Sequence, residues 1–468
     1  MKVYNSLTRR AEELVPLAGN EIRLYTCGPT VYNFAHIGNF RAYTFEDILR
    51  RVIRFNGMGV RQVMNLTDVD DKTIRNANAQ GVALNDYTKT YKDAFFADLA
   101  KLNVQPAEVY PAATDHVAEM IALVARLMEK GVAYQSEDKS VYFKVREFPG
   151  YGKLAHIDFD HQQTGLRCAA DEYDKENVGD FALWKAWEPS DGPVAWDSPW
   201  GRGRPGWHIE CSAMSMKYLG ETFDLHTGGI DNLFPHHENE IAQAEAATGK
   251  PFVKTWMHCA HLKVNGEKMS KSAGNFFTLR DLIEKGWSGR EIRYVLINAH
   301  YRTGLNFAFS ALEDARKALA RIDACVTALE QRAGGEAGDL SQASPEAAKC
   351  LEHFTEAVND DLNLPQAFAA LFDLVRETNA AMSRPEADAR WARASLAVFR
   401  RMDEVLGVVF FGRAEKADVP DEIKAMLDAR AAARKERNWA ESDRLRDAIA
   451  AAGWVVKDSK DGQSVTKK

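Results

Sequence analysis

Two short motifs contain residues that could bind phosphate. In the first, HIGN, His36 and Asn39 surround Gly38 just before a predicted helix. A helix N-terminus carries unpaired N–H groups and a positive dipole, and glycine lets a ligand approach the backbone closely. His36 and Asn39 could therefore both donate hydrogen bonds to phosphate oxygens. The alternative is an ordinary capped helix start with an incidental histidine.

The second motif, KMSKS, places Lys268 and Lys271 in a loop after a predicted strand. Their ammonium groups could stabilise the charge that builds on a pyrophosphate leaving group. The alternative is a solvated basic loop. Each motif alone is only weakly specific for nucleotide binding. The two motifs in this order, each at a strand end, are much more specific.

A third group of residues could hold a metal ion. If the segment FPHHENE is helical from Pro235, His236 and Glu240 are four residues apart and share one face. His237 would instead share a face with the apolar Ile241. The spacing therefore favours His236 and Glu240 as a ligand pair.

Two cysteines could complete that metal site. Cys27 ends the first predicted strand, and Cys211 lies in GWHIECSAM. Two thiolates, an imidazole and a carboxylate make a plausible zinc shell. However, a cytosolic cysteine is commonly a small buried hydrophobe, and the chain has no CxxC pair. Spacing alone leaves both alternatives open.

The first 70 residues predict the elements that would position these side chains. Strand 22–27, helix 39–55 and strand 60–67 form a β-α-β unit. A helix of this length between two strands implies a parallel pair and a doubly wound sheet. Ligands of such sheets bind at the carboxyl ends of the strands, here Tyr25–Gly28 and Asn65–Asp68.

The middle of the chain predicts an insertion into this sheet. Residues 72–130 are mostly helical in pattern, with a clear amphipathic run at 116–130. A short strand at 140–145 and a stretch rich in Trp, Pro and Gly then interrupt the pattern. The sheet pattern returns at residues 207–264, including a strand from 255 to 264.

The last third of the chain is predicted to be helical. Ser288 and Glu291 form a capping box at one helix start. Residues 310–410 have the pattern of a helical bundle, and a Pro-Asp break at 420–421 opens a final unit of two helices and a strand-like tail.

Composition limits the class of protein. The 468 residues are 46% hydrophobic and 27% charged, with a net charge of −7 and six cysteines. This balance is that of a globular protein with several domains, and no apolar run approaches the ~18 residues of a membrane span. The absence of a signal segment and of a disulfide framework predicts a cytoplasmic protein.

Taken together, the motifs resemble one family. YTCGPTVYNFAHIGN, NLTDVDDK, GRPGWHIECSAM, FPHHENEIAQ and EKMSKSAGNFF are similar to the cysteinyl-tRNA synthetases, a family of class I aminoacyl-tRNA synthetases. ARKERNWAESDRLRDAIAAAGWVVKD resembles the anticodon-reading module of that family. Two positions depart from the pattern: Asn39 stands where many class I enzymes have a second histidine, and Thr227 stands where a third glycine is expected.

The resemblance implies a two-step ligase reaction. ATP would activate L-cysteine to an adenylate with release of pyrophosphate, and the cysteinyl group would pass to the 3′ end of tRNA(Cys). His36, Asn39, Lys268 and Lys271 would be catalytic. The ATP site would also include Gly38, Met269 and Ser270, and Mg²⁺ would accompany ATP.

The resemblance also assigns the metal and the amino-acid pocket. In the family, zinc is held by the residues that match Cys27, Cys211, His236 and Glu240. Zinc binds a thiolate far better than a hydroxyl, so it could separate cysteine from serine without an editing domain. The predicted cysteine pocket has Trp207 as its floor. It also includes Cys27, Gly28, Thr30, Thr67, His226 and Asp231, for which purely structural roles are the alternative.

The tail is expected to bind tRNA. Basic and aromatic residues that could stack on unpaired bases or pair with phosphate are Arg430, Arg434, Arg437, Trp439 and Arg444, with Lys435, Arg446 and Trp454 nearby. The alternative is a solvated, salt-bridged helix pair.

For the whole protein, we expect a monomer without membrane contact. Two other functions compete with the tRNA ligase. One is a ligase that joins cysteine to an amino sugar; such an enzyme would lack the C-terminal anticodon-reading module. The other is a non-catalytic paralogue.

The fold class predicted is therefore α/β: a Rossmann-type doubly wound sheet with an insertion, a helical bundle and a small C-terminal module. The predicted segments are 1–115 and 206–265 for the two halves of the catalytic domain, 116–205 for the insertion, 266–309 for the KMSKS and stem-contact region, 310–415 for the bundle and 416–468 for the anticodon-binding module.

We expect Trp184, Trp187, Trp196 and Trp200 to be core residues. We expect Cys168, Cys259, Cys325 and Cys350 not to be ligands.

Overall fold

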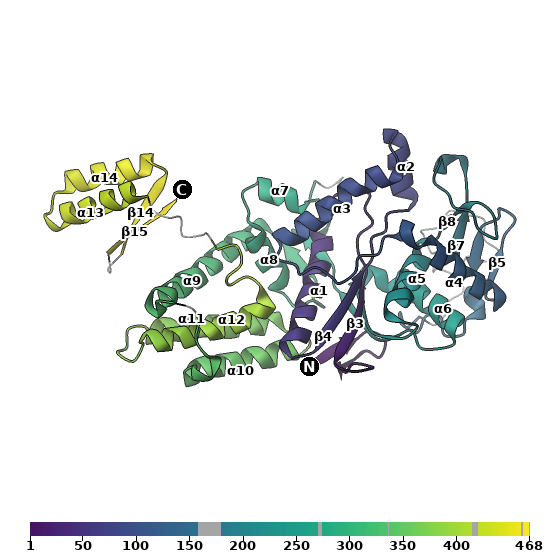
Figure 1. The fold of residues 1–468 in the computed structure, drawn as a ribbon, viewed down its shortest axis with the longest axis horizontal. Coiled ribbons are helices and arrows are strands. Elements are labelled where there is room, and N and C mark those ends of the chain that lie inside the picture. The colour runs from purple at the N-terminus through teal and green to yellow at the C-terminus, as the bar shows by residue number, and fades with distance from the viewer. Residues whose placement is uncertain (158–178, 270–273, 336, 414–419, 460–461, 468) are drawn as a thin grey trace. The chain divides into compact units, whose positions relative to one another are not determined.

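The computed structural model describes residues 1–157, 179–269, 274–335, 337–413, 420–459 and 462–467 (Figure 1). The chain divides into two compact units, Met1–Phe411 and Gly412–Lys468. Each unit has its own hydrophobic core. Within the described residues, every helix is either too short or too polar to cross a membrane.

The centre of the first unit is a four-stranded parallel sheet with the strand order β10-β9-β3-β4. Its strands are β3 (Glu21–Thr26), β4 (Gly59–Met64), β9 (Phe223–Gly229) and β10 (Val253–Cys259). The helix α1 (Ile37–Phe55) connects β3 to β4, as the sequence predicted. Because β4 and β9 lie on opposite sides of β3, the strand order reverses there, and a ligand crevice is expected at that edge.

Both faces of this sheet are covered, because consecutive strand residues point to opposite sides. Leu24 and Met64 belong to the core that α1 shares with the helices of the bundle. Tyr25 and Val63 belong to a second core, which includes residues of α5 (Trp207–Leu219) and α6 (Glu238–Thr248). In Figure 1, α1 and the pair α5 and α6 lie on opposite sides of β3 and β4.

The segment between β4 and the insertion is mostly helical, as predicted. The helices are α2 (Asp71–Gln80), α3 (Leu84–Lys101) and α4 (Val117–Glu129). Between α3 and α4, Val109 and Ala112 form parallel bridges beside β4 instead. Pairing with the sheet edge satisfies their backbone groups, which is a tertiary effect that the local pattern does not reveal.

The predicted insertion is an antiparallel sheet in the order β5-β6-β7-β8. Its strands are β5 (Ala133–Gln135), β6 (Val141–Phe143), β7 (Phe181–Ala186) and β8 (Gly203–Pro205). Trp184 is fully buried in the second core, Trp196 and Trp200 pack partly against it, and Trp187 is 38% exposed. The expectation of core tryptophans is confirmed for Trp184 and wrong for Trp187.

The single strand predicted at 255–264 is two strands in different sheets. β10 ends at Cys259, and β11 (Leu262–Val264) joins β12 (Glu267–Lys268) and β13 (Leu305–Phe307). The break moves the chain out of the main sheet and carries it into the KMSKS segment. Next come α7 (Leu279–Glu284) and α8 (Gly289–Ile297), which begins with the predicted Ser288 capping box.

The bundle and the second unit contain the remaining elements. The bundle helices are α9 (Phe309–Ala333), α10 (Pro345–Asn359), α11 (Leu364–Ala381) and α12 (Ala389–Leu406). The second unit contains α13 (Asp421–Lys435), α14 (Trp439–Ala451) and an antiparallel hairpin of β14 (Trp454–Ser459) and β15 (Gly462–Lys467). Another hairpin, β1 (Lys2–Asn5) and β2 (Arg10–Glu13), opens the chain.

Candidate active site and metal centre

A cavity of about 480 Å³ opens at the carboxyl edge of the central sheet, between β3 and β9. Most of the predicted site residues line it: Cys27, Gly28, Thr30, His36, Gly38, Asn39, Thr67, Trp207, Cys211, Asp231, His236 and Met269. These residues come from chain segments more than 200 positions apart. The sheet's switch point therefore assembles the site that the motifs indicated.

The HIGN motif forms the start of α1. His36 is the N-cap: its Nδ1 accepts a hydrogen bond from the Asn39 backbone N–H at 3.2 Å, and Asn39 Oδ1 accepts one from the His36 N–H at 3.1 Å. This reciprocal cap leaves His36 Nε2 and Asn39 Nδ2 as the groups that can face a ligand. Burial lowers the pKa of His36, although the Asp231 carboxylate opposes that shift, so the ring is neutral and Nε2 carries its proton.

Gly38 has no space for a side chain. A Cβ at this position would lie 2.7 Å from the Met269 Cε atom and 2.9 Å from the His36 ring. Met269 of the KMSKS motif therefore packs directly on the first turn of α1. The strand-like bridge between His36 and Thr278 and the hydrogen bond from the Ile37 N–H to the Phe277 carbonyl (3.0 Å) reinforce this contact.

The two predicted lysines are only partly placed. The Lys268 backbone belongs to β12, where it pairs with Lys263 of β11. Ser270, Lys271 and the side chain of Lys268 lie outside the described part of the structure, so the phosphate-binding roles of all three stay predictions.

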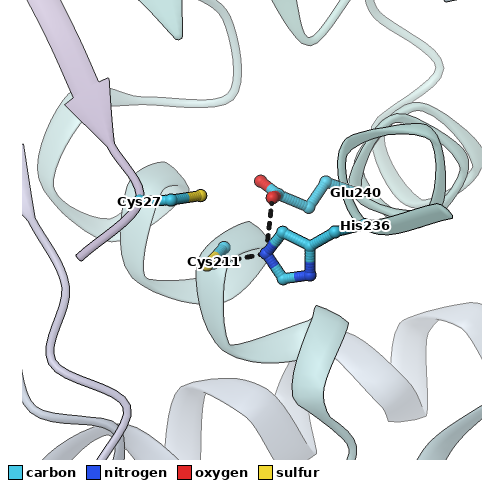
Figure 2. Close-up of side chains that lie close together, drawn as sticks. All are labelled: Cys27, Cys211, His236 and Glu240. Carbon is cyan, nitrogen blue, oxygen red and sulfur yellow. Dashed lines mark hydrogen bonds and ion pairs between the residues drawn. The ribbon is translucent and has the colours of Figure 1, made fainter. Parts of the chain in front are cut away.

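At the inner end of the cavity, Cys27, Cys211, His236 and Glu240 converge (Figure 2). Their ligand atoms all lie within 4.8 Å of one another, and all four residues are buried. His236 Nε2 is 3.4 Å from Cys211 Sγ and 3.1 Å from Glu240 Oε1. Cys27 comes from the end of β3 and Cys211 from α5, while the other two residues lie on and just before α6.

The cluster has the electrostatics of a cation site. Hydrogen bonding with Cys27 and the proximity of His236 lower the pKa of Cys211 to about 6, although burial opposes this shift. Burial would raise the pKa of Glu240, but His226 and His236 hold it at about 2. The positive charge that compensates these two anions is the His236 imidazolium: burial lowers its pKa, but Cys211 and Glu240 raise it to about 10. A divalent cation bound by the same donors would replace that proton.

The donor set also fits a divalent metal on a second criterion. Glu240 Oε1 is buried, forms an ion pair with His236 Nε2 at 3.1 Å and has no hydrogen bond of normal geometry among the described residues. When His236 is neutral, this oxygen has no other partner there, so a bound metal ion would satisfy it. Two thiols, one imidazole and one carboxylate are the donors that zinc prefers.

Two histidines behind the cluster differ from the sequence expectations. His226 was expected to contact substrate, but it is fully buried behind Glu240, with its Nε2 2.9 Å from Glu240 Oε2. His237 was expected to face away, but its Nε2 lies 3.3 Å from Cys27 Sγ. His226, His237, Cys27 and Glu240 thus form a second group with ligand spacing, which overlaps the first.

The other predicted pocket residues surround this end of the cavity. Trp207 is the first residue of α5, is 40% exposed and stacks on the His236 ring with centroids 4.2 Å apart. Thr67 is buried, and its hydroxyl donates to Glu210 Oε2 at 2.8 Å. Asp231 lies in the turn after β9. Thr227, the position that departs from the family pattern, points its hydroxyl to the buried Glu46 at 3.1 Å.

Sequence reasoning missed several residues of this region. Asn65, His261 and Lys263 line the cavity, and Glu210 lies behind Thr67. Asn65 lies in the segment that the strand-end rule marked, so that signal was available. His261 and Lys263 follow the break between β10 and β11, which no local pattern shows.

The remaining cysteines agree with the expectations in part. Cys325 and Cys350 are buried in the bundle core. Cys259 is buried too, but it lines the cavity. Cys168 lies outside the described residues.

Comparisons with known proteins identify the family. The family model of the class I (C) tRNA synthetase catalytic domain matches residues 13–317, the DALR domain matches 353–411, and the cysteinyl-tRNA ligase anticodon binding domain matches 416–465. A cysteine–tRNA ligase of Protochlamydia amoebophila is 49% identical over 475 residues, covering 100% of this chain and 98% of its own. One from Chlamydia muridarum is 46% identical over 474 residues, covering 99% of both.

The chain belongs to the cysteine–tRNA ligase family. It is thus an aminoacyl-tRNA-forming ligase with a class I catalytic domain.

Solved structures show the same fold. Methionyl-tRNA synthetase of Mycobacterium tuberculosis, in complex with methionyl-adenylate, matches with a TM-score of 0.59 at 16% identity, covering 84% of this chain and 90% of that one. LeuRS in a ternary LeuRS–tRNA–LeuAMS complex from Agrobacterium radiobacter K84 matches with a TM-score of 0.59 at 11% identity, covering 84% of each chain.

In the C-terminal unit, two of the residues expected at the tRNA-binding surface are buried. Arg430 is only 1% exposed, and its guanidinium pairs with Asp458 at 2.8 Å and with Gln463 at 2.6 Å. Trp454 is buried in the small core. Both residues therefore hold the hairpin against α13 and α14 instead of facing solvent.

The other predicted tRNA-binding residues of this unit are exposed. Trp439 is 56% exposed, and the Arg434 guanidinium lies 5.9 Å from its ring centroid. Arg437 is exposed as well, while Arg444 pairs with Glu441 at 2.6 Å. Their contact with tRNA stays a prediction.

Proposed function

We propose that this chain is a cysteine–tRNA ligase that uses zinc to select the thiol of its substrate. The carboxylate of L-cysteine attacks the α-phosphorus of ATP, and the bond to the pyrophosphate breaks. The terminal ribose hydroxyl of tRNA(Cys) then attacks the cysteinyl carbonyl, and AMP leaves. One observation carries the proposal: a cluster of two thiols, an imidazole and a carboxylate lies at one end of a cavity whose other wall is the capped start of α1.

The metal would be held by Cys27, Cys211, His236 and Glu240. Zinc bound there supplies a borderline-soft Lewis acid that prefers a thiolate to a hydroxyl. His226 orients the Glu240 carboxylate through its hydrogen bond, and Trp207 packs on the His236 ring. Such contacts to metal ligands fix their orientation.

The nucleotide would lie against α1, with Mg²⁺ accompanying its phosphates. His36 Nε2 and Asn39 Nδ2 donate to phosphate oxygens, because their other polar atoms are used in the cap. Asn39 thus keeps a donor where many class I enzymes have histidine. Lys268 and Lys271 would stabilise the charge that develops on the leaving pyrophosphate.

The deciding experiment is an aminoacylation assay. The purified chain is incubated with ATP, Mg²⁺, labelled cysteine and a tRNA carrying the cysteine anticodon, with serine and a second tRNA as controls. We expect transfer of cysteine to the cysteine tRNA alone. Cysteine-dependent pyrophosphate exchange without transfer would favour the amino-sugar ligase, although the matched anticodon-binding domain at 416–465 argues against that function. The absence of both activities would indicate a non-catalytic paralogue.

A further inference from the structure

Glu210 is a buried carboxyl group to which the proposed reaction has so far assigned no role. It lies on α5 directly before Cys211 and is fully buried. Its Oε2 accepts a hydrogen bond from the Thr67 hydroxyl at 2.8 Å, whereas its Oε1 has no hydrogen-bond partner among the described residues. Burying a carboxyl group with half of its hydrogen-bonding capacity unused is unfavourable for stability. A role in ligand binding would account for its presence.

The hydrogen bonds around Thr67 determine which way its hydroxyl points. Asn65 Oδ1 accepts from the Gly28 N–H at 2.9 Å, so Asn65 Nδ2 is the donor to Thr67 Oγ1 at 3.2 Å. The Thr67 hydroxyl therefore accepts from Asn65 and donates its proton to Glu210. A hydroxyl has one proton and two lone pairs, so one acceptor position of Thr67 is left.

The backbone of Thr67 is already paired. Its N–H donates to the Pro29 carbonyl at 3.1 Å, and its carbonyl accepts from the Val31 N–H at 3.0 Å. Thr67 also lines the cavity, next to Cys27 and Gly28. The group that it offers to a ligand is thus a hydroxyl oxygen whose proton points away, toward Glu210.

An acceptor at this position suits an ammonium group. This step rests on the proposed function: an amino acid whose thiol lies at the metal cluster and whose carboxylate lies near His36 must place its α-ammonium group on a wall between them. Thr67 is on such a wall, because it lines the same cavity as Cys211 and His36. We propose that Glu210 is a positioning residue that holds the Thr67 hydroxyl as an acceptor for the α-ammonium group of the substrate.

The test compares cysteine with 3-mercaptopropionate, which keeps the thiol and the carboxylate but lacks the ammonium group. Dissociation constants for both ligands are measured by calorimetry on the full chain. Because any change in metal content or folding affects both ligands, the ratio of the two constants isolates ammonium recognition. We expect the wild-type chain to bind cysteine at least ~10-fold more tightly, as a charge-assisted hydrogen bond allows.

In Glu210→Leu, which lacks an acceptor, the preference for cysteine should fall about tenfold or more. Glu210→Gln keeps a carbonyl oxygen that can accept from Thr67, so it should retain most of the preference. Thr67→Val should show the same loss as Glu210→Leu, and the double variant should show no further loss, because one residue acts through the other. Ser215→Ala, a buried change on the same helix that removes only a bond to the Ser212 carbonyl, should leave the ratio unchanged.

An unchanged ratio in Glu210→Leu, or additive losses in the double variant, would overturn the role of Glu210. If Glu210→Leu does not fold, Glu210→Met, which has nearly the length of glutamate but no carboxyl acceptor, takes its place, alone and combined with Thr67→Val. Failure of the proposed cysteine site gives a different result, because the wild-type chain would then bind neither thiol ligand, and the aminoacylation assay tests transfer to tRNA separately.

Discussion

At the scale of single residues, Cys211 provides the most direct test of the metal centre. Its thiol lies 3.4 Å from His236 Nε2, and its pKa is lowered to about 6 by hydrogen bonding with Cys27 and by His236, against the effect of burial. The structure thus favours the thiolate, which is the form that binds a metal. Serine has nearly the same shape but does not ionise near neutral pH.

Cys211→Ser should therefore reduce bound zinc to less than about a tenth of an equivalent, with loss of the preference for cysteine over serine. Elemental analysis of the purified variant measures the first effect, and pyrophosphate exchange with each amino acid measures the second. The matched control is Cys259→Ser, because Cys259 lines the same cavity but lies outside the metal cluster. Full zinc content in Cys211→Ser would refute its assignment as a ligand.

Gly38 tests the contact between the two phosphate-binding motifs. In Gly38→Ala, the added Cβ would meet Met269 Cε at 2.7 Å and the His36 ring at 2.9 Å, and the His36 ring is held by its cap to Asn39. We expect kcat/KM for ATP in pyrophosphate exchange to fall about tenfold or more, because the phosphate donors are displaced.

The control for Gly38→Ala is Gly335→Ala. Gly335 lacks a positive φ and has no atom within 4 Å of an added Cβ. Wild-type kinetics for ATP in Gly38→Ala would show that the close packing of the motifs is not needed for nucleotide binding.

At the scale of elements, α1 connects the cavity to the rest of the first unit. Its first turn carries the HIGN cap, and further along, Asp47 pairs with Arg293 of α8 at 2.6 Å. Between these, Glu46 is fully buried, and its Oε1 accepts from Thr227 of β9 at 3.1 Å. The threonine that departs from the family pattern thus links α1 to the strand that leads to Asp231.

Burial raises the pKa of Glu46 from 4.5 to about 8, and the Thr227 hydrogen bond opposes that shift. Between pH 4.5 and about pH 8, the folded chain therefore keeps a proton on Glu46 that the unfolded chain has released. The free energy of unfolding should therefore fall as pH rises through this window, by up to about 1.4 kcal/mol for each pH unit.

Glutamine at this position cannot titrate. Relative to the wild-type chain, Glu46→Gln should thus gain stability between pH 5 and pH 8, by up to about 4 kcal/mol, as measured by urea denaturation. Glu352→Gln, on an exposed position of α10, is the control. A constant difference between Glu46→Gln and wild type across this range would show that Glu46 does not titrate there.

At the scale of the whole molecule, the chain divides after Phe411. The first unit contains the cavity and the metal cluster, and the second has a small core of Ile423, Ile449, Trp454 and Val456. The residues proposed to read tRNA are exposed on the second unit. Activation of cysteine and recognition of tRNA should therefore be separable.

A chain ending at Phe411 should keep cysteine-dependent pyrophosphate exchange within about twofold of the full chain, because no site residue is removed. Its kcat/KM for charging tRNA should fall by about a hundredfold or more, as the anticodon contacts are lost. In the full chain, Trp439→Ala should weaken charging in the same direction, with Trp391→Ala on the bundle as a matched control. Equal loss of exchange and charging on truncation would show that the two functions are not separable.

The sequence by itself determined the features that depend on local spacing. The β-α-β unit and the pairing of His236 with Glu240 both follow from helix and strand periodicity. They hold in the structure because neighbours on one element keep their relation wherever that element packs. The family likewise follows from motifs that are read along the chain.

Only the tertiary structure decided how distant segments meet. His226 and His237 approach Glu240 and Cys27 because β3, β9 and α6 converge, which no spacing within one segment reveals. Arg430 and Trp454 look like a nucleic-acid surface in sequence, but the β14–β15 hairpin buries them. The strand predicted at 255–264 breaks because Leu262–Val264 finds partners in another sheet. Burial, and with it the pKa of a group such as Glu46, is a property of the packed molecule and not of the residue.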